Sequence, residues 1–432
     1  MLDIKFIREN PELVKQGIQN KNENDRVDEI LTLDEKRRRI ISEAEELKAK
    51  KNQVSVKIPQ MKKAGEDTTQ IFTEMKKVSD NISELDSKLR DVESELNGLL
   101  MYVPNLPHTS VPVGKTPEEN VEVRKWTPQG FSYHKEEKTL DHVELGKKLK
   151  ILDFERGAKI SGSGFPVYIG KGATLERALI NFMLDYHLTN HNYKEVFPPF
   201  LVNKESMQGT GQLPKMEDDM YCIEKDGLYP IPTAEVPITN LHRDEILADK
   251  DLPIKYVGYS ACFRREAGSY GKESKGFLRV HQFNKVEMVK IVKPETSYDE
   301  LENLVKDAED ILQVLKIPYR IIMLCTGDLS FSAAKCYDIE TWSPAEQKWL
   351  EASSCSNFED FQARRASIRF KREGDPAKIG ASKKPEFVHT LNGSGLATSR
   401  LMISLLESYQ TEEGTIKVPE VLQKYTGFIE IK

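Results

Sequence analysis

Between residues 30 and 100, apolar side chains recur at alternating steps of three and four residues, with a polar break at 64–67. This spacing is typical of a coiled-coil seam, and two such helices joined by a short Gly-containing break predict an antiparallel hairpin. The seam positions are Ile30, Leu33, Arg37, Ile40, Ala44, Leu47, Lys51, Val54, Ile58 and Met61 in the first helix, and Met75, Val78, Ile82, Leu85, Leu89, Val92, Leu96 and Leu99 in the second.

The predicted hairpin is too long and thin to pack entirely on a globular body. At 1.5 Å per residue, residues 33–62 would extend about 45 Å. We therefore expect an arm that projects, with a kink where Pro59 interrupts the first helix.

A proline-rich segment, residues 103–114, ends the coil because prolines stop helices. Beyond it, short helical stretches alternate with runs such as 253–266 and 277–292, which have the pattern of antiparallel strands. The chain contains neither a GxxxxGK[ST] phosphate loop nor a GxGxxG turn after a strand. Any nucleotide site is therefore expected to use neither a P-loop nor a Rossmann crevice.

The second of these runs separates two kinds of side chain by alternation. Alternate residues of a strand share a face. One predicted face is apolar, with Val280, Val286 and Met288, and the other carries charges and a ring: Arg279, His281, Phe283, Lys285 and Glu287. A ring among arginines favours stacking with a nucleobase while the arginines hold phosphates. A solvent-facing hairpin with salt bridges is the alternative.

Two further segments carry candidate chemistry. In the preceding strand, Arg264 and Glu266 share parity, so they are predicted to share a face. Residues 391–407 run from a small-residue turn into an apolar helix that contains Arg400. The glycines of this turn, Gly393 and Gly395, would permit close approach of a ligand to the backbone.

Charge is unevenly distributed along the predicted arm. Residues 34–65 carry ten Lys/Arg and five Asp/Glu, a net of +5, whereas residues 66–100 carry four and nine, a net of −5. Salt bridges between the helices are one interpretation. The other is a basic surface for a phosphate backbone, formed by Arg37, Arg38, Arg39, Lys50 and Lys51.

Composition narrows the class of protein. The 432 residues carry a net charge of −6 with 38% hydrophobic and 31% charged residues, a balance typical of a soluble protein. The N-terminus lacks the apolar run of a signal peptide, and no stretch is long enough to span a membrane. The five cysteines lack zinc-ligand spacing. We expect a cytoplasmic protein without zinc or a membrane partner.

Several motifs resemble those of class II aminoacyl-tRNA synthetases. FRRE at 263–266 with Arg279 resembles motif 2, GSGLATSR ending at Arg400 resembles motif 3, and 192–202 resembles motif 1, with Pro199 as its marker. GTGQLPK, PTAEVP, RVHQFNKVE, EASSCSNFEDFQARR and LNGSGLA are similar to the wording of the seryl-tRNA synthetase family, bacterial type. With the helical arm, this resemblance covers essentially the whole chain.

The resemblance implies an α+β architecture with an N-terminal antiparallel two-helix coiled-coil arm and a class II catalytic domain, a central antiparallel sheet flanked by helices. The expected domains are a tRNA-binding domain at 1–102, a linker at 103–115 and a catalytic domain at 116–432. It also implies a homodimer with Pro199 at its interface. The arm would bind tRNA(Ser) through Arg37, Arg38, Arg39, Lys50 and Lys51.

The implied activity is that of a serine–tRNA ligase. L-serine is activated by ATP to seryl-adenylate with release of pyrophosphate, and is then transferred to the 3′ end of tRNA(Ser), with tRNA(Sec) as an optional second acceptor. Alanine would leave the polar groups of a serine pocket unpaired. The implied serine-binding residues are Thr233, Ala234, Glu235, Glu287, Asn392 and Ser394.

The same resemblance assigns the nucleotide site. Arg264 contacts the α-phosphate and the serine carboxylate, Phe283 and Arg400 enclose the adenine, and Glu351 with Ser354 binds Mg²⁺. The implied catalytic residues are Arg264, Glu266, Arg279 and Arg400, and the implied ATP-binding residues are Arg264, Arg265, Glu266, Arg279, Val280, Phe283, Glu351, Ala352, Ser353, Ser354 and Arg400.

Two alternatives differ from this assignment in class. A ligase of the same class could use a carrier protein as acceptor, but the complete heptad arm argues against it. A scaffolding or RNA-binding protein with an inactive synthetase domain is the other, and the presence of Arg264, Glu287 and Arg400 argues for an active enzyme.

Overall fold

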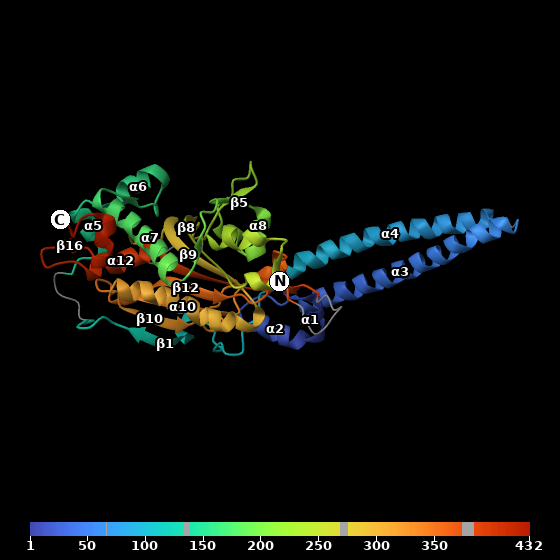
Figure 1. Ribbon diagram of the computed structural model, residues 1–432, viewed down its shortest axis with the longest axis horizontal. Coiled ribbons are helices and arrows are strands. Elements are labelled where there is room, and N and C mark those ends of the chain that lie inside the picture. The colour runs from blue at the N-terminus through green and yellow to red at the C-terminus, as the bar shows by residue number, and fades with distance from the viewer. Residues whose placement is uncertain (66, 134–138, 268–274, 374–383) are drawn as a thin grey trace. The chain divides into compact units, whose positions relative to one another are not determined.

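The computed structural model divides the chain into an N-terminal unit, Met1–Pro104, and a C-terminal unit, Asn105–Lys432 (Figure 1). Within these units the structure describes residues 1–65, 67–133, 139–267, 275–373 and 384–432. None of the described helices is long and apolar enough to cross a membrane.

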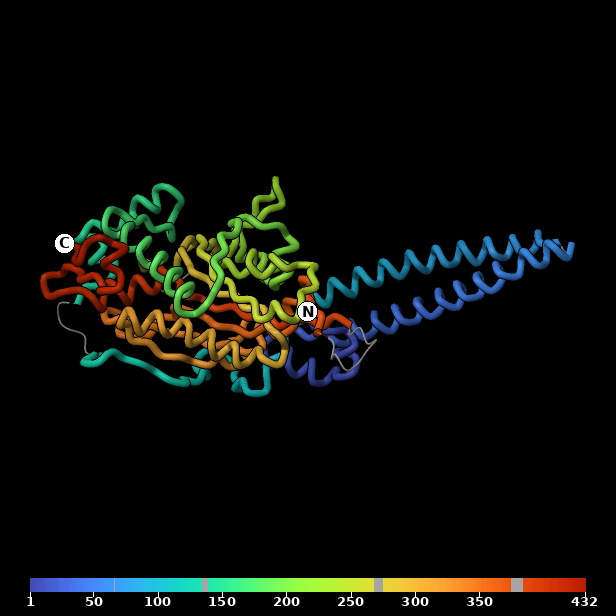
Figure 2. Tube along the Cα trace, viewed as in Figure 1, coloured from blue at the N-terminus to red at the C-terminus, as the bar shows by residue number. Residues whose placement is uncertain are grey.

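The N-terminal unit consists of two short helices followed by a long helical hairpin. Its helices are α1 (Ile4–Glu9), α2 (Pro11–Asn20), α3 (Val27–Lys63) and α4 (Thr69–Leu100). The trace in Figure 2 runs out along α3 and returns along α4. The predicted long hairpin is therefore confirmed, and α3 continues through Pro59. Gly65 follows α3 with a φ of +77°, which glycine adopts without steric penalty.

The predicted seam lies between α3 and α4. Each of its positions is buried or half-buried, including the polar Arg37 and Lys51. Near the tip, apolar side chains of both helices form one cluster: Leu47, Val54, Ile71, Met75, Val78 and Ile82. Burial of this apolar stripe stabilises the two helices, because packing of an apolar face contributes more to helix stability than intrinsic helix propensity does.

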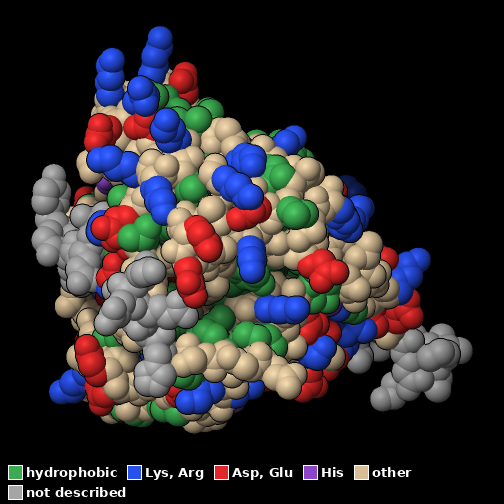
Figure 3. All heavy atoms as spheres, turned by 90° about the vertical axis from the view of Figure 1, so that its left-hand side faces the viewer, with side chains coloured by type: hydrophobic (Ala, Val, Ile, Leu, Met, Phe, Trp, Pro, Cys, Tyr) green, Lys and Arg blue, Asp and Glu red, His purple; other side chains and the backbone are tan. Residues whose placement is uncertain are grey.

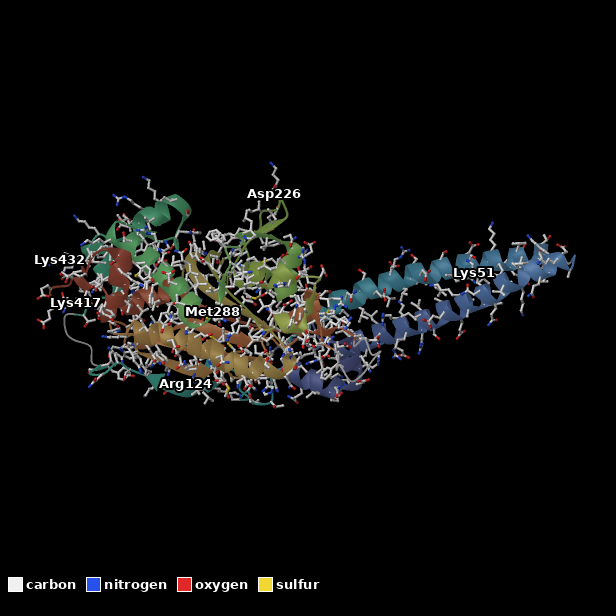
Figure 4. The ribbon with its side chains drawn as sticks, viewed as in Figure 1. Lys51, Arg124, Asp226, Met288, Lys417 and Lys432 are labelled. Atoms are coloured by element: carbon white, nitrogen blue, oxygen red, sulfur yellow. The ribbon has the colours of Figure 1, made fainter. Side chains whose placement is uncertain are left out.

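Ion pairs at the base of the hairpin involve the predicted arginine cluster. The carboxylate of Asp34 is fully buried; its Oδ2 accepts from Arg8 Nη1 at 2.7 Å and from Arg38 Nε at 3.1 Å. Arg37 Nε donates to Glu93 of α4 at 3.0 Å, and Arg39 pairs with Glu35. Salt bridging between the helices is therefore confirmed for Arg37, whereas Arg38 and Arg39 pair within α3 and Lys50 is exposed. Figure 4 labels Lys51 on the same helix.

The C-terminal unit is built on an eight-stranded sheet in the order β1-β10-β11-β12-β15-β9-β8-β4. All neighbours pair antiparallel except β4 and β8, which pair parallel. The strands are β1 (Val121–Trp126), β4 (Lys194–Glu195), β8 (Ile254–Phe263), β9 (Gln282–Val292), β10 (Tyr319–Met323), β11 (Lys335–Ser343), β12 (Lys348–Asn357) and β15 (His389–Ala397).

Helices α7, α10 and α12 pack on this sheet and bury its core. Met288 of β9 is fully buried there (Figure 4). The helices are α5 (His142–Lys148), α6 (Phe154–Ser161), α7 (Lys171–Asn190), α8 (Lys204–Thr210), α9 (Glu235–Thr239), α10 (Ser297–Val314), α11 (Phe361–Arg365), α12 (Thr398–Ser408) and α13 (Glu420–Thr426). On the face shown in Figure 3, charges of both signs are interspersed.

Short strands complete the unit outside the main sheet. One sheet has three strands and the others are two-stranded ribbons. The strands are β2 (Leu152–Asp153), β3 (Val167–Tyr168), β5 (Leu201–Asn203), β6 (Leu228–Pro230), β7 (Ile246–Ala248), β13 (Arg369–Lys371), β14 (Glu386–Phe387), β16 (Ile416–Lys417) and β17 (Glu430–Ile431).

The two central strands are shorter than alternation predicts. β8 ends at Phe263 and β9 begins at Gln282, so Arg264, Glu266, Arg279 and His281 lie outside the strands. Hydrogen bonds to other segments draw the chain out of the ladder. The amide of Arg265 donates to the carbonyl of Asp219 at 2.9 Å, and that of His281 donates to the carbonyl of Gly164 at 2.8 Å.

The glycine turn before α12 was also predicted wrongly. Gly393 and Gly395 lie within β15 instead of a turn, and a Cβ at either position would clash with a neighbouring side chain. A Cβ on Gly393 would lie 2.8 Å from Cys355 Sγ, and one on Gly395 would lie 2.5 Å from His187 Nε2. These glycines therefore permit close packing of β12 and α7 against β15.

We predict that Asp34→Asn loosens the base of the arm. The substitution removes a buried carboxylate that accepts two charged hydrogen bonds, so it should destabilise the N-terminal unit by about 2 kcal/mol. Hydrogen exchange of α1 and α3 in the full-length protein measures this. Asp86→Asn is the matched control because the pair of Asp86 with Lys48 is exposed and should contribute less than about 1 kcal/mol. Equal protection in both variants would contradict the prediction.

Candidate active site

A cavity of about 420 Å³ opens over the strands β9, β12 and β15. Residues just before α9, just after β8 and just before β9 also line the cavity. Predicted site residues that line it are Thr233, Glu235, Arg264, Glu266, Arg279, Val280, Phe283, Glu287, Glu351, Ala352, Ser353, Ser354, Asn392, Ser394 and Arg400. Burial of Lys285 and Glu287 rules out the solvent-facing hairpin.

A buried charged network forms one part of the cavity. Lys285 and Glu287 of β9 form an ion pair, and Lys285 Nζ also donates to Thr233 Oγ1 at 2.8 Å. The two oxygens of Glu287 accept from Thr233 Oγ1 and from Asn392 Nδ2, each at 3.2 Å. This pairing compensates the burial of both charges. The network offers a carboxylate, an amide and a hydroxyl to a small polar ligand.

Glu235 lies next to this network and is 6% exposed. Gln362 Nε2 donates to its Oε1 at 2.6 Å, and Gln362 is held in turn by the hydroxyl of Thr390 at 2.7 Å. Burial, and then the negative charge of Glu287, raises the pKa of Glu235 to about 7. Two neighbouring carboxylates thus differ in environment: Glu287 is paired with a lysine, whereas the charged form of Glu235 is disfavoured.

Arginines and an aromatic ring form another part of the cavity. The guanidinium of Arg264 lies 5.2 Å from the centroid of the Phe283 ring, and its Nε donates to the carbonyl of Pro232 at 3.4 Å. Arg279 Nη1 pairs with Glu266 Oε2 at 3.1 Å. Glu266 has a φ of +50°, in the left-handed region that is uncommon for residues other than glycine. The set presents cations and a π face, which suit phosphates and a base.

A bulge in β12 gathers the acidic side of the cavity. Glu351 and Ser354 are three residues apart and would lie on opposite faces of a regular strand. However, Glu340 pairs with Glu351 and Ile339 with Ser353, so β12 carries an extra residue, Ala352. Such a bulge re-aims the side chains on either side of it, and both Glu351 and Ser354 line the cavity.

The oxygens at this bulge fit a hard divalent cation. Asp338 pairs across the strands with Ser354, and its burial together with the charge of Glu351 raises its pKa well above the usual value. A cation would relieve that repulsion, and carboxylate and hydroxyl oxygens are the ligands Mg²⁺ takes. Arg400 Nη1 pairs with Glu351 Oε2 at 3.1 Å. No group of three or more His, Cys, Asp or Glu is placed to hold a metal ion in the described residues.

Comparisons with known proteins agree along the whole chain. The profile of the seryl-tRNA synthetase N-terminal domain matches residues 1–107, and that of the tRNA synthetase class II core domain (G, H, P, S and T) matches 218–409. The serine–tRNA ligase of Chloroherpeton thalassium is 60% identical and that of Chlorobium phaeobacteroides (strain BS1) 58%, each over 99% of both chains. The chain belongs to the seryl-tRNA synthetase family.

Solved structures of seryl-tRNA synthetases have the same fold. The Pyrococcus horikoshii enzyme complexed with ATP matches with a TM-score of 0.91 and 41% identity, and the cytoplasmic enzyme of Naegleria fowleri in complex with AMP matches with 0.86 and 31%. Each covers 100% of this chain and 99% of the other. The expected α+β class II architecture is confirmed.

Two residues expected in this synthetase site lie outside the cavity lining. Ala234 is fully buried and precedes α9, so only its neighbours Thr233 and Glu235 reach the cavity. Arg265 follows Arg264, but its amide hydrogen bond to Asp219 turns the chain there. Arg264 lies over the ring of Phe283, and Phe283 and Arg400, which were expected to enclose the adenine, both line the cavity.

Several lining or supporting residues were missed as site residues. Lys285 shares the predicted charged face with Phe283 and Glu287, so alternation could have identified it. Gln362 lies in the segment EASSCSNFEDFQARR, but nothing local in the sequence indicates that it contacts Glu235. Phe331 and Ser332 reach the cavity from the segment before β11, which carries no motif.

We predict that Glu235 makes stability depend on pH. Below pH 4.5 the carboxyl is protonated in both folded and unfolded chains, and the folded chain keeps the proton up to pH 7. The stability it contributes is thus lost as pH rises through this window. Between pH 5 and 8 the native protein should lose roughly 2 to 3 kcal/mol relative to Glu235→Gln. Urea unfolding at both pH values measures the difference, and a constant difference would contradict the raised pKa.

Proposed function

We propose that this cavity is where the chain, a serine–tRNA ligase, joins L-serine to ATP. Seryl-adenylate and pyrophosphate are formed, and serine then passes to the 3′ end of tRNA(Ser). One observation carries the assignment: the Lys285–Glu287 network and the Arg264–Phe283 pair open into the same cavity. An amino-acid subsite and a nucleotide subsite thus adjoin in a chain of this family.

The reaction needs positioning and charge neutralisation more than acid–base chemistry. The serine carboxylate attacks the α-phosphorus, a new P–O bond forms, and the bond to pyrophosphate breaks. Because a carboxylate is already a nucleophile, no general base is required. Arg264 adjoins both subsites, where its guanidinium can hold the serine carboxylate and an α-phosphate oxygen together as charge develops.

Serine is recognised by the polar groups around Glu287. Glu287 and Thr233 bind the ammonium or hydroxyl, and Asn392 and Ser394 complete the pocket from β15. The existing bonds of Glu287 to Thr233 and Asn392 hold its carboxylate in place before the ligand enters. An alanine ligand would leave these buried groups unpaired, which supports rejection by up to several kcal/mol.

Mg²⁺ is held by Glu351 and Ser354 together with ATP phosphates. The cation supplies neutralisation of phosphate charge when it is bound. Arg279 and Arg400 hold the remaining phosphate and base contacts from opposite sides of the cavity. When Arg400 binds the nucleotide, that contact replaces its present ion pair with Glu351.

The chain forms a homodimer through the segment that resembles motif 1. Exposed apolar side chains support this: Phe197 is 74% exposed, Leu201 is 44% exposed, and Pro199 lies between them. Burial of such a patch against a second copy removes it from water.

The helical hairpin binds the tRNA. Its first helix is basic, but Arg37, Arg38 and Arg39 pair with carboxylates of the same unit. Lysines nearer the tip are therefore better placed for phosphates; Lys50 is exposed and has Lys51 beside it. The expected length of the arm suits an RNA element remote from the 3′ end.

We predict that Arg264→Ala lowers serine-dependent exchange of pyrophosphate into ATP by about a thousand-fold, because neutralisation at the α-phosphate is lost. Arg265→Ala is the matched control, since it removes the same charge from a neighbouring position outside the cavity. It should stay within about three-fold of the native rate. Near-native exchange by Arg264→Ala would refute the assignment of this residue.

We predict that shortening the arm separates activation from tRNA charging. Lys48 pairs with Asp86 across the helices, so residues 49–85 can be replaced by a four-residue Gly-containing turn that leaves this pair and the base intact. Pyrophosphate exchange should be unchanged, while KM for tRNA rises at least about ten-fold as phosphate contacts are lost.

A charge-matched pair of variants tests the surface itself. Lys50→Gln with Lys51→Gln should reduce the salt dependence of tRNA binding by about one to two units of slope. Lys76→Gln with Lys77→Gln removes the same charge from α4 and should leave the slope unchanged. For the variant with the shortened arm, normal tRNA charging would show that the arm has another role.

A further inference from the structure

A buried histidine outside the cavity contacts the backbone of the segment that carries Arg279. His142, the first residue of α5, is fully buried, and its Nε2 lies 3.2 Å from the amide nitrogen of Phe277. Phe277 lines the cavity and is followed by Leu278 and Arg279, which line it too. The hydrogen bond thus lies two residues from an arginine of the nucleotide subsite.

The hydrogen-bond partners of His142 determine which of its ring nitrogens carries the proton. Glu407 Oε1 accepts from the amide of His142 and lies 3.1 Å from its Nδ1. Glu407 Oε2 accepts from the hydroxyl of Ser343 and, at 3.2 Å, from the amide of Ala345. Nε2 faces the amide N–H of Phe277 and must accept, so the ring proton lies on Nδ1, which donates to Glu407.

The contact between this histidine and the backbone is close. Gly276 has a φ of +61°, and a Cβ there would lie 2.1 Å from His142 Nε2. The ring of Phe277 stacks on His142 with centroids 5.8 Å apart and on Tyr168 at 5.3 Å. Lys275 forms an ion pair with Asp141, the residue that caps α5. Three successive residues before Leu278 are thus held by α5 and its cap.

The same network reaches the other arginine of the nucleotide subsite. Glu407 lies on α12, seven residues after Arg400, which places the two on one side of the helix about 10 Å apart. The bonds from Glu407 to His142 and from His142 to Phe277 therefore join α12 to the segment of Arg279. These two elements supply the arginines of the nucleotide subsite from different parts of the sequence.

We propose that His142 is a positioning residue for ATP: by accepting the amide hydrogen of Phe277 while Glu407 orients its ring, it sets Arg279 relative to Arg400. The proposal rests on the assignment of this cavity as the nucleotide site. It concerns only the nucleotide, because the Lys285–Glu287 network shares no hydrogen bond with His142 among the described contacts.

Two substitutions of His142 separate its two bonds. In His142→Asn, the amide group occupies the place of Nδ1 and donates to Glu407, but the amide of Phe277 loses its acceptor. In His142→Gln, the terminal oxygen reaches the place of Nε2 and accepts from Phe277, but Glu407 loses a donor. KM for ATP and for serine is measured for both variants by pyrophosphate exchange.

His142→Asn should raise KM for ATP about ten-fold and leave KM for serine within about two-fold. His142→Gln should keep KM for ATP within about three-fold although its thermal stability falls. Ser343→Ala, which removes a different donor from Glu407, is the control for destabilisation without loss of the Phe277 bond. An unchanged KM for ATP in His142→Asn, or equal increases in all three variants, would overturn the proposal.

Equilibrium dialysis with ATP distinguishes failure of this proposal from failure of the assigned activity. Were the native protein to bind ATP but exchange no pyrophosphate, the assigned activity would fail, and the ratio of ATP dissociation constants for His142→Asn and His142→Gln would still test the positioning role. A ratio near one would refute it, and a ratio of about three or more would support it.

Discussion

In the middle of the sheet, β9 pairs with β8 on one side and with β15 on the other, and its register decides which side chains face the cavity. Glu287 pairs with Ser394 on β15 and with Gly258 on β8. Side chains alternate along a strand, so a slip of one residue would turn Glu287 and Lys285 to the opposite face and expose Val286 instead. The cavity therefore depends on this pairing before any ligand contact is made.

Two departures from regular pairing adapt the sheet to its ligands. The bulge at Ala352 brings Glu351 and Ser354 to one cavity, and a second irregularity lies in β15, where Ser394 pairs with Glu287 but Ala397 pairs with Lys285. Extra residues at these points bend the strands and re-aim their side chains. The polar groups are thereby placed on rigid strands, which limits the reorganisation that binding requires.

The sequence predicts those features whose contacts are local. The seam of α3 and α4 depends on steps of three and four residues, and the charged face of β9 depends on alternation, so both could be recognised. The ends of β8 and β9 could not, because they are set by bonds to Asp219 and Gly164, far away in the chain. Motif resemblance predicted fifteen of the residues that line the cavity, whereas Gln362 enters through a contact that no local pattern encodes.

Charge neutralisation differs between the two units in a way that follows from burial. In the arm, the buried Asp34 accepts hydrogen bonds from arginines whose other sides remain in water, so pairing is tolerated at low energetic cost. In the cavity, Lys285, Glu287 and Glu235 are all buried, and Lys285 forms its ion pair with Glu287. Burial, and then the charge of Glu287, raises the pKa of Glu235. A ligand that carries an ammonium group would add positive charge beside these buried carboxylates and so favour the ionised form of Glu235.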